Sequence, residues 1–142
     1  MDRDAYEAGL AIRREVLGSE YVDRSLASAD EFTRPLQELI TQYCWGEIWG
    51  RPELDRRTRS IVNLGMLAAL NRPHELKLHV RGALRNGVTR TELREIFLQV
   101  AVYCGAPAAL DAFRVAREVF AEEEKGTPQA GRGAAGGSPG AP

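Results

Sequence analysis

Residues that end or begin helices recur along residues 1–124, and they constrain the fold more than any other feature. Between them, apolar side chains repeat at the spacing of an amphipathic helix. No stretch shows the strict apolar and polar alternation of a strand. The sequence therefore predicts an all-α, single-domain fold of about six to seven helices. The residues that mark the helix boundaries are Gly18, Gly50, Pro52, Asn71, Pro73, Gly87, Gly105 and Pro107.

Some of the expected helices also have recognisable caps. Asp55 is a good N-cap, because its carboxylate can accept a hydrogen bond from a backbone N–H of the first turn. Thr89 and Glu92 form a capping box, in which each side chain accepts from the backbone N–H of the other. The helices are expected over residues 4–17, 21–28, 33–49, 55–70, 73–86, 91–104 and 107–124.

The last segment, residues 125–142, differs in composition from the rest. It consists almost entirely of Gly, Ala, Pro and small polar residues. Such a segment buries too little apolar surface to offset its loss of conformational entropy. We therefore expect one helical domain over residues 1–124, followed by a disordered tail or a linker over residues 125–142.

The composition narrows the classes of partner and compartment. A formal net charge of −1 gives no bulk electrostatic reason to expect a nucleic acid or an anionic membrane as partner. No window has the roughly 20 apolar residues of a membrane span, and residues 1–10 do not resemble a secretory signal. The two cysteines, Cys44 and Cys104, lie far apart and form no CxxC pair. A reduced, cytoplasmic setting is expected.

Two expected helices suggest self-association. Residues 55–70 and 91–103 are apolar around much of the helix circumference. A single bundle of this length has little room to bury both on all sides. A homo-oligomer is the favoured interpretation, and a monomer with one packed central helix is the alternative.

Glu75 and His79 are a candidate acid–base pair, since residues at i and i+4 share a helix face. Taken alone, such a pair is more often structural. Trp45 and Trp49 have the same spacing at a helix C-terminus. They are either core residues or a pocket wall that excludes water from a charged substrate group.

Several arginines crowd the start of the helix that Asp55 caps. Cations there oppose the helix dipole and call for a compensating anion. That anion could be an acidic side chain such as Asp55 or Glu53, a residue of a neighbouring subunit, or a carboxylate substrate. A solvated basic edge is a further alternative. The arginines proposed to bind substrate are Arg51, Arg57 and Arg59.

Cys104 is a further candidate, because a cysteine at a helix end can act as a nucleophile or an acid. A buried structural role is commoner for a lone cysteine. The lack of a CxxC companion argues against dithiol redox chemistry.

The order of the short motifs resembles that of the γ-carboxymuconolactone decarboxylases. The resemblance covers roughly residues 4–122, and the ordered combination is more specific than any one motif. The motifs are Arg13-Arg14-Glu15-Val16-Leu17-Gly18, Trp45-Gly46-Glu47-Ile48-Trp49, Arg57-Thr58-Arg59-Ser60, Glu75-Leu76-Lys77-Leu78-His79, Asn86-Gly87-Val88-Thr89 and Tyr103-Cys104-Gly105-Ala106-Pro107.

The resemblance implies the helical fold of alkylhydroperoxidase D-like proteins and a homohexamer. It implies decarboxylation of 4-carboxymuconolactone to 3-oxoadipate enol-lactone, a lactone dicarboxylate substrate, no cofactor and no metal. The redox relatives use a Cys-x-x-Cys-x-x-x-His helix. Here only His79 remains on the matching helix, with Glu75 at the second cysteine position, and this departure points to acid–base chemistry.

In this interpretation His79 is the polar group at the lactone oxygen or the proton donor, and Glu75 is its partner or the acid itself. Cys104 is the remaining candidate for the final acid. The rival functions are an alkylhydroperoxidase-like redox protein that uses Cys104, alone or with Cys44, and a non-catalytic helical scaffold. A decarboxylase or isomerase of a related lactone is also compatible with the sequence.

Overall fold

The computed structural model describes residues 1–126, and this part of the chain is helical almost throughout. The expected all-α fold is confirmed, and no strand occurs within the described range. No helix there has both the length and the apolar character needed to cross a membrane. The elements are α1 (Arg3–Leu17), α2 (Ser19–Ala27), α3 (Arg34–Leu39), the π-helix η1 (Ile40–Ile48), α4 (Arg56–Ala69), α5 (Pro73–Arg85), α6 (Arg90–Cys104) and α7 (Ala106–Gly126).

The helix boundaries follow the local chemistry expected of them. The Asp55 carboxylate accepts from the backbone N–H of Thr58 at 2.7 Å. Thr89 and Glu92 form the expected capping box. Asn71 has a φ of 55°, the left-handed conformation expected where α4 ends. α7 continues to Gly126, two residues beyond the expected boundary, and the remainder of the proposed tail lies outside the described residues.

The prediction of one continuous α-helix over residues 33–49 is wrong in one respect. It begins as the short α-helix α3 and continues as the π-helix η1. The backbone N–H of Trp49 donates to the carbonyl of Cys44, five residues earlier, at 2.9 Å. π-Helices are rare and occur frequently at functional sites. The wider turn changes which side chains of this segment share a face.

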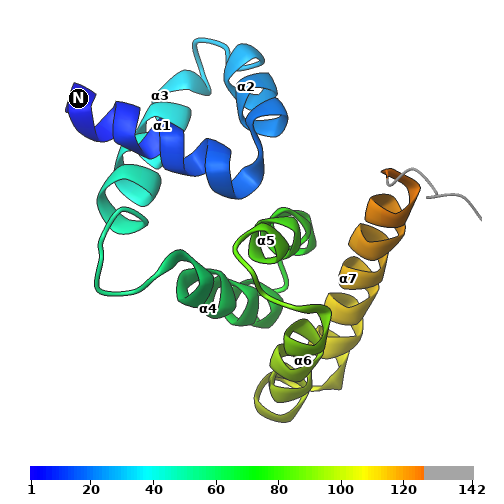
Figure 1. Ribbon diagram of the computed structural model, residues 1–142. Helices are drawn as coiled ribbons and strands as arrows, with labels where there is room; N and C mark the ends of the chain where they lie inside the picture. Colours follow the sequence, from blue (N-terminus) through cyan, green and yellow to red (C-terminus); the bar gives the residue numbers. More distant parts are fainter. Residues whose placement is uncertain (127–142) are drawn as a thin grey trace, which may run out of the picture.

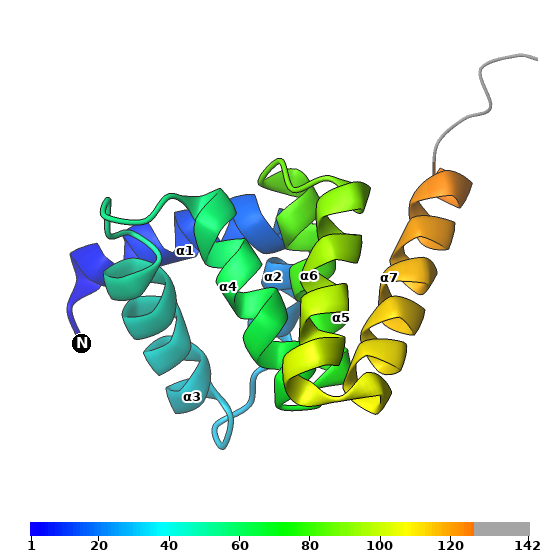
Figure 2. The same cartoon turned by 90° about the horizontal axis from the view of Figure 1, so that it is seen from below.

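Two groups of helices build the fold, each around its own apolar cluster. Figure 1 shows α1 to η1, in blue to teal, as one group, and α4 to α7, in green to orange, as the other. The first cluster includes Val16, Val22 and Trp45. The second is larger and includes Leu64 and Phe97. Figure 2 shows α4 between the α3–η1 segment and α6, while the direct packing between the two groups is mainly that of α1 on α5.

The helices α1 and η1 cross at a contact between two glycines. A Cβ atom added to Gly9 would lie 2.0 Å from the carbonyl oxygen of Thr41 and 2.6 Å from the nitrogen of Gly46. A Cβ atom added to Gly46 would lie 2.2 Å from the carbonyl oxygen of Ala5. Only glycine permits backbones to approach this closely. This contact fixes η1 against α1.

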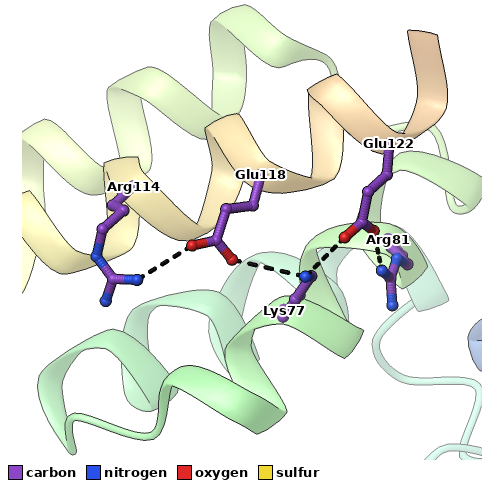
Figure 3. A network of polar contacts seen from close by, with 5 residues as sticks. All are labelled: Lys77, Arg81, Arg114, Glu118 and Glu122. Carbon is purple, nitrogen blue, oxygen red and sulfur yellow. Dashed lines mark hydrogen bonds and ion pairs between the residues drawn. The ribbon is translucent and has the colours of Figure 1, made fainter. Parts of the chain in front are cut away.

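α5 is fixed on two sides. At its C-terminal end, the Arg85 guanidinium donates to the carbonyl oxygen of Val16 in α1 at 3.2 Å. Along its length, an ion-pair network joins it to α7 (Figure 3). The Lys77 ammonium lies 2.7 Å from one carboxylate oxygen of Glu122 and 3.5 Å from one of Glu118. Arg81 also binds Glu122. These contacts hold the helix that carries Glu75 and His79.

Candidate active site

A pocket of about 420 Å³ lies where η1, α4 and α5 meet. Most of its wall is apolar or aromatic, with few polar groups, as is usual for a small-molecule site. η1 contributes most of the lining, while α4 and α5 contribute one polar side chain each. The lining residues are Ile40, Tyr43, Cys44, Trp45, Ile48, Trp49, Asn63 and His79.

His79 and the two tryptophans form an aromatic cluster in this pocket. The imidazole and the Trp45 indole are parallel to within 2°, with ring centroids 6.1 Å apart. The Trp49 ring centroid lies 6.2 Å from that of His79. The two indoles stack on each other at 4.8 Å. The tryptophans therefore serve both interpretations given above, because they belong to the core and also line the pocket that contains His79.

The surroundings of His79 keep its imidazole neutral. Burial lowers the pKa of His79 to about 4, against the opposing effect of the nearby Glu75 carboxylate. Its Nδ1 atom is buried and has no hydrogen-bond partner among residues 1–126. A neutral imidazole carries one N–H donor and one acceptor nitrogen. At neutral pH this side chain can donate a hydrogen bond without bringing a full positive charge into the pocket.

Glu75 lies outside the pocket. It precedes His79 by one turn of α5 but is exposed and does not line the cavity. No hydrogen bond joins its carboxylate to Nδ1 of His79. Glu75 and His79 are therefore not hydrogen-bonded partners in this structure. Glu75 acts on His79 only through its charge, because the two side chains lie in different surroundings.

Two of the crowded arginines have acidic partners in the same chain. Arg57 binds Glu92 at the start of α6, and Arg56 binds Glu15 in α1. The anion that the helix-dipole argument calls for is thus supplied by two carboxylates that the sequence reasoning did not identify as partners of these arginines. Arg57 links α4 to α6, and its contact with Glu92 gives it a structural role within the subunit.

Arg51 and Arg59 form a different pair. The Arg59 guanidinium donates to the carbonyl oxygen of Arg51 at 3.2 Å, while its Nε is buried and has no partner in the described part of the chain. Arg51 is paired only loosely with Glu53, at 3.6 Å and on the surface. Arg59 precedes Asn63 by one turn of α4, so both lie on the same helix face. This pair is therefore the cationic group closest along α4 to the pocket.

The structure does not bring Cys104 to His79. Cys104 is exposed and lines a separate apolar groove of about 290 Å³ between α4 and α6. α4 separates the two sites, with Asn63 toward His79 and Val62 and Gly65 toward Cys104. Within one subunit, the structure therefore places Cys104 apart from Glu75 and His79. Cys44, by contrast, lines the His79 pocket.

Sequence reasoning missed three lining residues: Ile40, Tyr43 and Asn63. Asn63 had a detectable signal, because it is a polar residue within the apolar run from Ile61 to Leu67. Ile40 and Tyr43 gave no such sequence signal, since the orientation of their side chains depends on the π-helical geometry of η1.

Comparisons with known proteins agree with the fold and the motifs. The model of the carboxymuconolactone decarboxylase family matches residues 34–118. A nitrosuccinic acid decarboxylase of Metarhizium robertsii is 48% identical over 120 residues, which is 84% of each chain. A 4-carboxymuconolactone decarboxylase of Acinetobacter baylyi is 44% identical over 119 residues, 84% of this chain and 89% of that protein. An uncharacterized 15.0 kDa protein of Paracoccus denitrificans is 34% identical over 84 residues, 57% of this chain and 62% of that one.

The family model covers η1, α4 and α5, the elements that build the pocket, as well as all of α3 and α6 and part of α7. This chain belongs to the carboxymuconolactone decarboxylase family.

Proposed function

We propose that the protein is a cofactor-independent decarboxylase that converts 4-carboxymuconolactone to 3-oxoadipate enol-lactone and carbon dioxide. The observation that carries this proposal is the neutral His79 imidazole in a tryptophan-walled pocket. The 44% identity to a 4-carboxymuconolactone decarboxylase supports the choice of substrate.

The reaction needs a hydrogen-bond donor at the lactone oxygen. The bond between the ring carbon and its carboxylate breaks, and the electron pair moves through the ring double bond onto the lactone carbonyl oxygen. The resulting dienolate then takes a proton on the carbon next to the carbonyl. The substrate itself accepts the electrons, so the residues have to stabilise charge and move one proton.

A neutral His79 suits this task better than a charged one. Its N–H can donate to the carbonyl oxygen as negative charge develops there, an interaction that strengthens in the transition state. An imidazolium would instead bind the substrate carboxylate and stabilise the state that has to react. Asn63, on the opposite helix, offers a second neutral donor within the same pocket.

The tryptophans fit the departure of carbon dioxide. Trp45 is 4% exposed and Trp49 is 8% exposed, so their rings present a dry surface. A carboxylate held against them has few hydrogen bonds, whereas neutral carbon dioxide loses nothing there. The Arg51–Arg59 pair, one turn of α4 away from Asn63, would bind the acetate arm of the substrate.

Nitrosuccinate is a second candidate substrate, favoured by the 48% identical relative. It also has an acetate arm and a carboxylate on a carbon next to an electron-accepting group. Loss of carbon dioxide would leave a nitronate, whose oxygens would occupy the place of the lactone oxygen beside His79. Both reactions call for the same arrangement of donor, dry wall and arginine.

The two cysteines line different pockets, which gives an alkylhydroperoxidase-like dithiol no support within one subunit.

For the proposed enzyme we also infer a homo-oligomer, with a hexamer as the expected assembly. Along α4 and its C-cap, Val62, Met66 and Leu70 form an exposed apolar stripe. On α6, Leu98 and Val102 are also exposed. Such surface is typical of an interface.

The test is a direct assay of carbon dioxide release from 4-carboxymuconolactone and from nitrosuccinate under the same conditions. A higher kcat/KM for the lactone supports the proposal, and a higher value for nitrosuccinate selects the second candidate. No release from either substrate by folded protein would overturn both.

A further inference from the structure

Arg13 is a buried cation that has only neutral partners. It is 5% exposed, and no carboxylate lies within ion-pair distance among residues 1–126. Its two terminal nitrogens donate to the hydroxyl of Thr41 and to the side-chain carbonyl of Gln37, each at 3.0 Å. Its Nε has no partner in this part of the chain. Burial lowers its pKa, with Tyr6, Tyr21 and Cys44 as the ionisable groups around it.

A buried charge without an opposite charge is costly, and an apolar residue of similar volume is often neutral or stabilising in its place. Stability alone therefore gives little reason for an arginine at this position. Its two contacts suggest another reason.

The two contacts lie on either side of the junction between α3 and η1. Gln37 belongs to α3, which ends at Leu39, and Thr41 belongs to η1, which begins at Ile40. The Thr41 hydroxyl in turn donates to the backbone carbonyl of Gln37 at 2.7 Å, so it accepts from Arg13 with a free lone pair. One guanidinium thus spans the point where α-helical geometry changes to π-helical geometry.

The position of this junction determines the pocket wall. Cys44, Trp45 and Trp49 all follow it within η1 or at its end. In a helix with 3.6 residues per turn, one residue of register corresponds to a rotation of about 100°. If the π-helical turn were lost, the tryptophans would rotate relative to His79.

We infer that Arg13 is a positioning residue, which fixes the α3–η1 junction and thereby holds the tryptophan wall against His79. The inference rests on the proposed function only where turnover is measured. The aromatic cluster itself can be observed in the protein without substrate.

The experiment compares Arg13→Met and Thr41→Val with Arg14→Met. Arg14 is the next residue of α1, and its half-exposed guanidinium binds Asp23 in α2 at 2.7 Å. The control therefore removes the same charge from the same helix without touching the junction. The readouts are the pKa of His79 from NMR titration, assigned with a His79→Gln variant, and the near-ultraviolet circular dichroism of the stacked indoles.

Arg13→Met and Thr41→Val are expected to raise the pKa of His79 from about 4 by at least about one unit, toward the value near 6.5 of an exposed histidine. The signal of the indole stack should weaken, and kcat for whichever substrate is accepted should fall by about 10-fold or more. Arg13→Lys can keep one of the two contacts, so its His79 pKa, dichroism signal and kcat should lie between those of Arg13→Met and the wild type. Arg14→Met should leave all readouts unchanged.

Folded variants with a lower melting temperature but an unchanged His79 pKa and an unchanged near-ultraviolet spectrum would show that Arg13 is merely structural. If Arg13→Met does not fold, Thr41→Val and Gln37→Met test the two contacts separately, with the same outcomes. If no substrate is turned over, the proposed function fails, while the NMR and dichroism results still decide the role of Arg13.

Discussion

The imidazole of His79 lies parallel to the indole of Trp45, with an angle of 2° between the ring planes and 6.1 Å between the ring centroids. Because Nδ1 is buried without a partner, Nε2 is the ring nitrogen of His79 that can exchange a hydrogen bond with a ligand. Burial removes water from the imidazole and lowers its pKa to about 4.

His79→Ala is expected to lower kcat by about 10²-fold or more, because it removes the donor to the developing oxyanion. His74→Ala is the matched control, since His74 is exposed at the first turn of the same helix. Steady-state kinetics and circular dichroism of both variants make the comparison. A folded His79→Ala enzyme with near-normal turnover would remove this residue from the mechanism.

Acid should weaken the folded state through His79. The unfolded chain protonates this imidazole near pH 6.5, whereas the folded protein keeps it neutral to about pH 4. In that window the unfolded state binds more protons, so the free energy of unfolding falls as the pH falls from 6.5 to about 4. The loss amounts to roughly 3 kcal/mol at most, at about 1.4 kcal/mol per unit.

Urea denaturation at fixed protein concentration, at several pH values, measures this loss. The His79→Gln variant should lack this part of the pH dependence but keep the part due to carboxylates with a lowered pKa, such as Asp55 and Glu122. Identical slopes for both proteins would contradict the prediction.

Arg59 and Arg57 should respond differently to truncation. Arg59→Ala is expected to raise KM by about 10-fold with a smaller change in kcat, because its guanidinium is proposed to bind the acetate arm. Arg57→Ala should leave KM nearly unchanged and lower stability by no more than about 1 kcal/mol, because its ion pair with Glu92 is half exposed. A raised KM for Arg57→Ala with an unchanged KM for Arg59→Ala would exchange the two roles. Dissociation of an oligomer by either variant would indicate that its arginine lies in an interface.

Bound substrate or product should protect one cysteine from alkylation. Cys44 lines the His79 pocket, whereas Cys104 lines the groove between α4 and α6. With a thiol reagent and mass spectrometry, ligand is expected to slow modification at Cys44 and not at Cys104. Cys104→Ser should retain turnover. Protection at Cys104 alone would place the ligand in the other groove.

The exposed stripe on α4 and α6 should mediate self-association. Val102 is 81% exposed and Met66 is 50% exposed, which is unusual for such side chains on neighbouring helices. Val102→Asp is expected to reduce the oligomer to monomers in analytical ultracentrifugation, because it buries an unpaired charge in the interface. Ser28→Asp adds the same charge at an exposed site after α2 and serves as control. A wild-type protein that is monomeric at micromolar concentration would contradict the prediction.

Much of the fold could be predicted from local sequence chemistry. Asn71, Gly18, Gly87 and Gly105 mark helix ends as expected and have positive φ angles, and Asp55 and Thr89 act as caps. These features depend only on residues close in sequence. The change from α3 to η1 was missed, because the residues at this transition have a long-range partner, Arg13 of α1, which a local pattern does not reveal.

The candidate site could be predicted only in part for the same reason. His79, Trp45 and Trp49, each named as a candidate from the sequence, lie together in one pocket. The separation of Cys104 from them depends on how α4 packs between α5 and α6, which a sequence pattern does not encode. The partners of Arg56 and Arg57 come from α1 and α6, far away in sequence.

The contact between Gly9 and Gly46 has a consequence for redesign of the pocket. No side chains separate the two backbones, so η1 has no compressible layer behind it. A bulkier acid could not gain room by pushing the tryptophans toward α1. It could gain room only on the opposite wall, where Asn63 projects from α4. Libraries meant to widen the range of accepted acids should therefore vary Asn63 before either tryptophan.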